Sequence, residues 1–155
     1  MNRGVEHVWF TTTGGKFWID ATGDLIQAAA TVAMARPAGL EFVEDIDEID
    51  GVSALLVGTV NGLFVTFYSA HRTPGHWARL GACSDMPATM VTAITYDAYT
   101  DSLHVATFGR GVYTMQDAKL ALHTLMLQQD AEKCEVASPK PAPSNAYLLP
   151  AQQAC

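Results

Sequence analysis

Two stretches of the chain, residues 56–66 (LVGTVNGLFVT) and residues 104–114 (HVATFGRGVYT), follow one pattern. In each stretch a strand-like segment leads into a tight turn, and a second segment that carries an aromatic residue returns. The Asn61-Gly62 pair is a strong hairpin signal, because both residue types tolerate the positive φ that a two-residue turn requires. Thr59 and Thr107 hold equivalent positions about 48 residues apart, so the sequence predicts two consecutive units of one structural repeat.

Further short segments rich in β-branched and aromatic residues, bounded by Gly, Asn, Asp or Pro, predict more strands. The clearest strands are predicted at residues 8–11, 54–59, 63–67, 90–96, 103–107 and 112–115, with weaker ones at 31–35 and 77–80. No long helical period separates these segments, which argues against a parallel βαβ sheet. Residues 1–116 are therefore expected to form an antiparallel meander.

The C-terminal part of the chain has a different pattern. Residues 117–134 predict a short helix, which Asp117 can cap and in which Leu122, Leu125 and Met126 have helical spacing. Residues 135–155 contain four of the seven prolines among Ser, Ala and Gln, and this composition predicts a disordered tail.

The composition predicts a folded domain with one acidic region. Of the 155 residues, 49% are hydrophobic and 16% are charged, which excludes a wholly disordered or fibrous chain. The net charge of −7 argues against nucleic acid as a partner. Six of the sixteen acidic residues fall within residues 41–50, so we expect an acidic loop there and a nearly neutral surface elsewhere.

No segment predicts a membrane or secretory function. The longest apolar stretch, residues 25–35, is far shorter than the ~20 residues that a membrane-spanning helix needs. No signal peptide is visible, so a cytoplasmic location is the default expectation and no membrane partner is expected. The three cysteines lack metal-ligand spacing and predict neither a disulfide scaffold nor a zinc site.

Residues 11–18 (TTTGGKFW) have the outline Ser/Thr-x-x-x-Gly-x-x-Trp, and residues 66–77 follow it more loosely. With these segments the chain resembles the family of β-propellers built from BNR (Asp-box) repeats, which includes sialidase-type, xyloglucanase-like and sortilin-like propellers. The family motif has Asp at its third position and commonly Thr at its seventh, where this chain has Thr13 and Phe17. The resemblance covers residues 5–116 and is strongest to the C-terminal blades of such proteins.

The resemblance implies an all-β fold of about two antiparallel four-stranded propeller blades. Residues 8–20 would supply the outer two strands of one blade, residues 31–80 a whole blade, and residues 90–115 three strands of the next. Because two blades cannot close a ring, the remaining propeller blades or identical chains are the expected partners.

This architecture implies a scaffold or binding module that is not catalytic by itself and that takes a carbohydrate or protein ligand. One alternative is the C-terminal part of a glycoside hydrolase of the sialidase or xyloglucanase-like type. Another is an oligomeric propeller lectin, in which several copies of the chain complete one ring.

Alternate connections of a meander lie at opposite ends, and the resemblance implies that ligands meet the end that carries the turns at Asn61 and at residues 108–110. The candidate ligand-binding residues are Asn61, Asp85, Phe108 and Arg110. A glycosidase needs two carboxylates roughly 5–10 Å apart, and Asp85 is the one acidic residue expected at this end. We therefore assign no catalytic residue, metal or cofactor.

Other residues have two interpretations each. The acidic stretch could chelate calcium but lacks the order of an EF-hand loop, so a solvated loop is favoured. His71 and His76 could contact a metal, although a surface turn without a third ligand is favoured. Trp18 and Trp77 could stack on sugars, but the resemblance implies that the box tryptophan packs between sheets.

Overall fold

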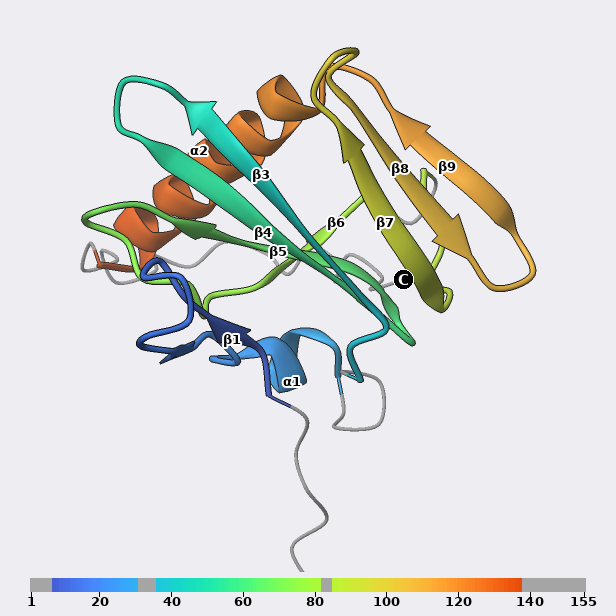
Figure 1. Cartoon of the computed structure of the whole chain (residues 1–155), viewed down its shortest axis with the longest axis horizontal. Coiled ribbons are helices and arrows are strands. Elements are labelled where there is room, and N and C mark those ends of the chain that lie inside the picture. The colour runs from blue at the N-terminus through green and yellow to red at the C-terminus, as the bar shows by residue number, and fades with distance from the viewer. Residues whose placement is uncertain (1–6, 31–35, 82–84, 138–155) are drawn as a thin grey trace, which may run out of the picture.

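The computed structural model describes residues 7–30, 36–81 and 85–137, and these residues form three antiparallel sheets and two helices (Figure 1). The first sheet pairs β1 (Trp9–Phe10) with β2 (Ile19–Asp20), and α1 (Leu25–Ala28) follows it. The second sheet contains, in order, β3 (Gly39–Asp47), β4 (Val52–Thr59), β5 (Gly62–Tyr68) and β6 (Ala78–Leu80). The third sheet contains β7 (Val91–Asp97), β8 (Ser102–Thr107) and β9 (Gly111–Met115), and α2 (Ala118–Ala137) ends the described chain.

The two stretches of the predicted repeat form equivalent hairpins, β4–β5 and β8–β9. The Thr59 hydroxyl donates a hydrogen bond to the Gly62 carbonyl at 3.0 Å, and the Thr107 hydroxyl donates to the Gly111 carbonyl at 2.8 Å. Both glycines have positive φ, at 123° and 82°, which glycine adopts without steric cost. The repeat is therefore confirmed for its hairpins.

The expectation of an acidic loop over residues 41–50 is wrong, because most of this stretch is strand β3. Val43 and Ile46 point into the core, while the carboxylates between and around them point outward. A bulge between Val43 and Asp47 breaks the alternation of buried and exposed residues, and Asp45 takes a φ of 52° within it. The bulge and the high charge together hide the strand from sequence patterns. The weaker strand predicted at residues 31–35 lies outside the described residues.

The four-stranded sheet is covered on both faces, so every residue of β4 is buried. One face packs against the three-stranded sheet and α2; this core includes Leu56, Leu63, Val65, Val91, Leu103, Val105, Leu122 and Met126. The other face packs against the β1–β2 hairpin and α1; this core includes Val8, Ala21, Leu25, Leu55, Val57, Phe64 and Trp77. The chain is thus a stack of three sheets.

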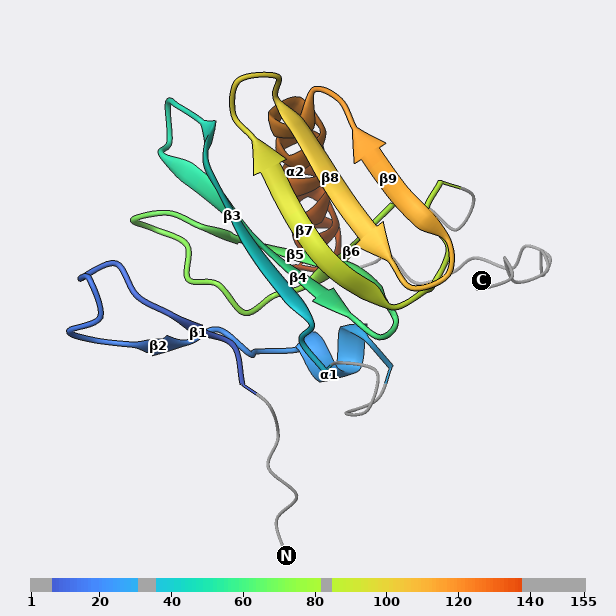
Figure 2. The same cartoon turned by 45° about the vertical axis from the view of Figure 1, so that its right-hand side comes forward.

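The two larger sheets approach each other at Gly58 and diverge toward their other ends, where α2 lies between them (Figures 1 and 2). The predicted helix is confirmed and extends to Ala137. None of the sheets formed by the described residues closes on itself, and these residues by themselves do not form a propeller ring. The predicted tail falls largely outside the described residues.

Candidate functional site: an aromatic groove

The four residues predicted to bind a ligand lie in different surroundings. The tips of the β4–β5 and β8–β9 hairpins, which carry Asn61, Phe108 and Arg110, lie at the same end of the molecule (Figure 2). The Asn61 side chain donates a hydrogen bond to the Ala29 carbonyl at 3.3 Å, so it joins its hairpin to the end of α1. Phe108 is 74% exposed, and Arg110 is exposed beside it.

Asp85 lines a small apolar pocket of about 140 Å³ between the edges of the two larger sheets. Its neighbours in this pocket include Met86, Leu103 and Tyr113. None of the other three predicted residues lines this pocket, so the structure does not bring the four residues together there.

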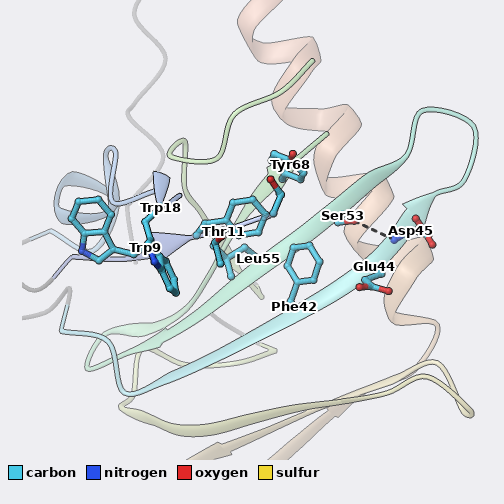
Figure 3. Close-up of a pocket in the computed structure, with 11 residues that line it drawn as sticks. Trp9, Thr11, Trp18, Phe42, Glu44, Asp45, Ser53, Leu55 and Tyr68 are labelled. Carbon is cyan, nitrogen blue, oxygen red and sulfur yellow. Dashed lines mark hydrogen bonds between the residues drawn. The ribbon is translucent and has the colours of Figure 1, made fainter. Parts of the chain in front are cut away.

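A larger groove, which we call the aromatic groove, lies between the β1–β2 hairpin and the sheet of β3, β4 and β5 (Figure 3). It has a volume of about 610 Å³. It is lined by Trp9, Phe10, Thr11, Thr12, Trp18, Phe42, Glu44, Asp45, Ser53, Leu55 and Tyr68. Five of these residues are aromatic, so aromatic rings make up much of the lining of the groove.

The turn that begins with Thr11 positions one wall of the groove. The Thr13 hydroxyl accepts a hydrogen bond from the Phe17 backbone N–H at 2.9 Å, and the Thr11 hydroxyl accepts one from the Gly15 N–H at 3.2 Å. Gly14 and Gly15 have positive φ of 63° and 85°. Two threonine hydroxyls thus accept backbone hydrogen bonds within this turn and hold it closed.

Aromatic rings in contact form the inner part of the groove. The ring centroid of Phe10 lies 4.7 Å from that of Tyr68 and 5.7 Å from that of Phe42, with the rings tilted in both pairs. These separations lie within the favourable range for aromatic pairs. The rings therefore form a packed surface contributed by three different strands.

The two tryptophans of the groove are about half exposed, Trp9 at 53% and Trp18 at 57%. The expectation that Trp18 packs between sheets is wrong, because its side chain lines the open groove and is exposed there. The same expectation is confirmed for Trp77, which is 4% exposed and whose indole N–H donates to the Ala21 carbonyl at 2.9 Å.

Glu44 and Asp45 line the end of the groove opposite the tryptophans (Figure 3). The β3 bulge turns both of these consecutive side chains toward the groove. Both are exposed, and neither carboxylate makes a hydrogen bond or ion pair with another described residue. No basic residue lines the groove, so it carries two uncompensated negative charges.

A second cleft, of about 370 Å³, lies between α2 and the turns at the other end of the sheet, and Asp47, Arg72 and Asp130 in its lining each have an oppositely charged or histidine partner. Arg72 forms an ion pair with Asp130, and the Nε2 of His123 lies 3.3 Å from a carboxylate oxygen of Asp47. Backbone N–H groups of Asp50 and Ile49 lower the pKa of Asp47 by stabilising its carboxylate. These pairs attach α2 to the sheet.

The two histidines considered as metal contacts do not form a metal centre. His71 lines the second cleft, whereas the Nδ1 of His76 lies 2.6 Å from a carboxylate oxygen of Asp24. Within the part of the chain that the structure describes, no group of three or more His, Cys, Asp or Glu side chains is arranged to hold a metal ion. No helix among the described residues is long and apolar enough to cross a membrane.

Sequence reasoning considered Trp18 as a ligand contact but missed Trp9, Phe10, Phe42, Glu44 and Tyr68. The apolar residues interspersed among the acidic residues of 40–47 are the available signal of a strand there, and the dense negative charge obscures it. A scan against models of known protein families, a search of curated proteins and a search of solved structures each found no match to this chain.

Proposed function

We propose that this chain is a non-catalytic binding module of the Asp-box propeller type, and that its aromatic groove holds a carbohydrate. The observation that carries the proposal is the pair of half-exposed indole rings, Trp9 and Trp18, beside further aromatic rings. Flat aromatic faces pack against the C–H faces of sugar rings. The groove volume of about 610 Å³ falls within the roughly 300–1,000 Å³ of small-molecule sites.

The stacked sheets support the propeller part of the proposal. A four-stranded sheet lies between a two-stranded and a three-stranded sheet, which is the strand count expected for one whole blade and parts of its two neighbours. Further blades or identical chains would complete the ring, and the hairpin end with Asn61, Asp85, Phe108 and Arg110 would then be a second place for ligand contact.

The glycoside hydrolase alternative finds less support in the groove. Its two carboxylates come from consecutive residues of one strand, Glu44 and Asp45, whereas a hydrolase places its two acids on either side of the scissile bond. The lectin alternative differs from a scaffold in oligomeric state, and a measurement of molar mass separates the two.

Calorimetric titration of the full chain with a panel of neutral, anionic and cationic oligosaccharides tests the proposal. We expect one class to bind, and we expect Trp18→Ala to weaken its affinity about tenfold or more because a stacking surface is lost. Phe17→Ala is the matched control, since Phe17 is exposed on the same turn but does not line the groove. Equal affinity in the wild type and Trp18→Ala, or no binding by any of the oligosaccharides, would contradict the proposal.

A further inference from the structure

We propose that the ligand of the aromatic groove is cationic: an oligomer of amino sugars with free ammonium groups, in preference to a neutral or anionic oligosaccharide. This inference rests on the proposed function of the groove and specifies its substrate class. It is carried by the charges that line the groove and by where they lie relative to the indole rings.

The groove offers negative charge without any compensating group. Glu44 and Asp45 line it, both carboxylates are exposed, and neither is paired with another described residue. An anionic sugar would bring a like charge next to these carboxylates, which is unfavourable. A neutral sugar can donate hydroxyl hydrogen bonds to them, whereas an ammonium group donates hydrogen bonds and adds the attraction between opposite charges.

The distribution of charge along the chain attracts a cation to the groove. The net charge is −7, and six of the sixteen acidic residues fall within residues 41–50, which contain the acidic end of the groove. Outside that segment ten acidic residues face nine basic ones, so the negative potential is concentrated around β3 and the turn after it. A cationic ligand is therefore attracted to the groove more than to other parts of the surface.

The arrangement of the groove favours an extended ligand. The half-exposed tryptophans lie at one end and the carboxylates at the other, with Phe10, Phe42 and Tyr68 contributing rings to the lining (Figure 3). A ligand that uses both ends needs flat apolar faces and ammonium groups at separate positions along its length. An amino-sugar oligomer has both, and its ammonium groups also interact favourably with the faces of indole rings.

A peptide with a methylated lysine is another cationic ligand that aromatic side chains recognise. Its single ammonium group fits a closed aromatic cage better than an elongated groove of about 610 Å³. It is included in the experiment below as a competing outcome.

The experiment measures binding of the full chain to three oligomers of equal length: glucosamine, N-acetylglucosamine and glucose. We expect the glucosamine oligomer to bind about tenfold or more tightly than its N-acetylated form, at a pH that protonates its amino groups. We expect this preference to shrink as salt concentration rises. Glu44→Gln combined with Asp45→Asn removes both charges, and asparagine tolerates the left-handed backbone at residue 45. This variant should bind the glucosamine and N-acetylglucosamine oligomers with nearly equal affinity.

Glu48→Gln is the matched control, because Glu48 is exposed in the turn after β3 and does not line the groove. It should keep the preference for the glucosamine oligomer. If the three oligomers bind equally and the charge variant changes nothing, the inference is wrong while the carbohydrate function stands. If none of them binds, the proposed function fails as well. Binding of a trimethyl-lysine peptide in place of the oligomers would also overturn the inference.

Discussion

Asp101 shows how one side chain joins three parts of the fold. Its carboxylate accepts a hydrogen bond from the Tyr96 hydroxyl at 2.9 Å and one from the Lys119 backbone N–H, in the first turn of α2, at 3.1 Å. Its own carbonyl accepts from the Ala118 N–H at 3.0 Å. The sequence predicts Asp117 as the helix cap, but the carboxylate that satisfies a first-turn N–H is that of Asp101, because the β7–β8 turn brings it to the helix N-terminus.

Asp101→Ala should therefore destabilise the protein by about 1–3 kcal/mol, since it removes a helix cap and leaves a half-buried tyrosine hydroxyl without its acceptor. Asp117→Ala is a matched control, because the two residues have similar positive φ of 47° and 50° and suffer similar backbone strain on substitution. Urea unfolding of both variants measures the difference. Equal losses of stability would show that the side chain of Asp101 contributes nothing.

Tyr96 gives a pH-dependent test at the same site. Burial, followed by its hydrogen bond to Asp101 and the negative charge of that carboxylate, raises the pKa of Tyr96 to about 12. In the unfolded chain the pKa of tyrosine is about 10, so between these two values the unfolded state loses the proton first. Stability should therefore fall as pH rises from about 10 to about 12.

The stability advantage of the wild type over Tyr96→Phe should shrink over that range, because phenylalanine does not titrate. Urea unfolding at several alkaline pH values measures this advantage, and an ultraviolet titration of the folded protein reports the tyrosine directly. An advantage that stays constant from pH 9 to pH 12 would mean that Tyr96 titrates alike in both states.

At the scale of elements, the stack depends on how closely two sheets approach. Gly58 of β4 lies against Val91 of β7, so a Cβ atom at residue 58 would lie 2.5 Å from Val91 Cγ1 and 2.9 Å from its Cβ. Valine is branched at Cβ and cannot move its methyl group away without shifting its strand. The small residue in the repeat pattern thus serves close packing between neighbouring sheets.

Gly58→Ala should destabilise the protein by about 1–3 kcal/mol through overpacking. Gly39→Ala is the control: Gly39 pairs with Gly58 in the same sheet, but a Cβ there would meet its nearest atom at 3.5 Å, an ordinary contact. We expect this control to be neutral or slightly stabilising, because alanine restricts the unfolded chain. Thermal unfolding measures the melting temperatures of the two variants. Equal melting temperatures would contradict the close approach of the two sheets at Gly58.

At the scale of the whole molecule, the three-sheet stack leaves apolar side chains exposed on its outer elements. Ile19 is exposed on the β1–β2 hairpin, and Val112 is exposed on β9, which has no strand on its far side among the described residues. A ring of blades would cover such surfaces on both outer sheets. The propeller proposal therefore predicts that copies of this chain associate.

We expect the full chain to associate into a discrete oligomer, with identical chains contributing the neighbouring sheets. Size-exclusion chromatography with light scattering measures the molar mass over a range of concentrations. Val112→Asp, which places a charge on the exposed edge strand, should shift the protein toward smaller species. A well-folded wild-type monomer at every concentration would rule out a ring made of identical chains.

Local features of the sequence predicted the elements well where the turn residues and the β-branched segments beside them indicate the same hairpin. The β4–β5 hairpin follows from Asn61-Gly62, of which Gly62 takes the positive φ and Asn61 does not, and the β8–β9 hairpin follows from a glycine on either side of Arg110. The helix follows from the spacing of its apolar residues. These are interactions between residues near each other in the chain, so the sequence pattern contains them.

The sequence by itself thus determined an antiparallel β-rich chain with a repeated hairpin and a C-terminal helix. Only the tertiary structure decided that residues 39–47 form a strand, because a bulge there replaces the alternation that a pattern search needs. The tertiary structure also forms the aromatic groove, because it brings Trp18, Phe42 and Tyr68 together from separate parts of the chain. Such a site depends on which faces the folded elements turn toward each other, and spacing along the chain does not encode those faces.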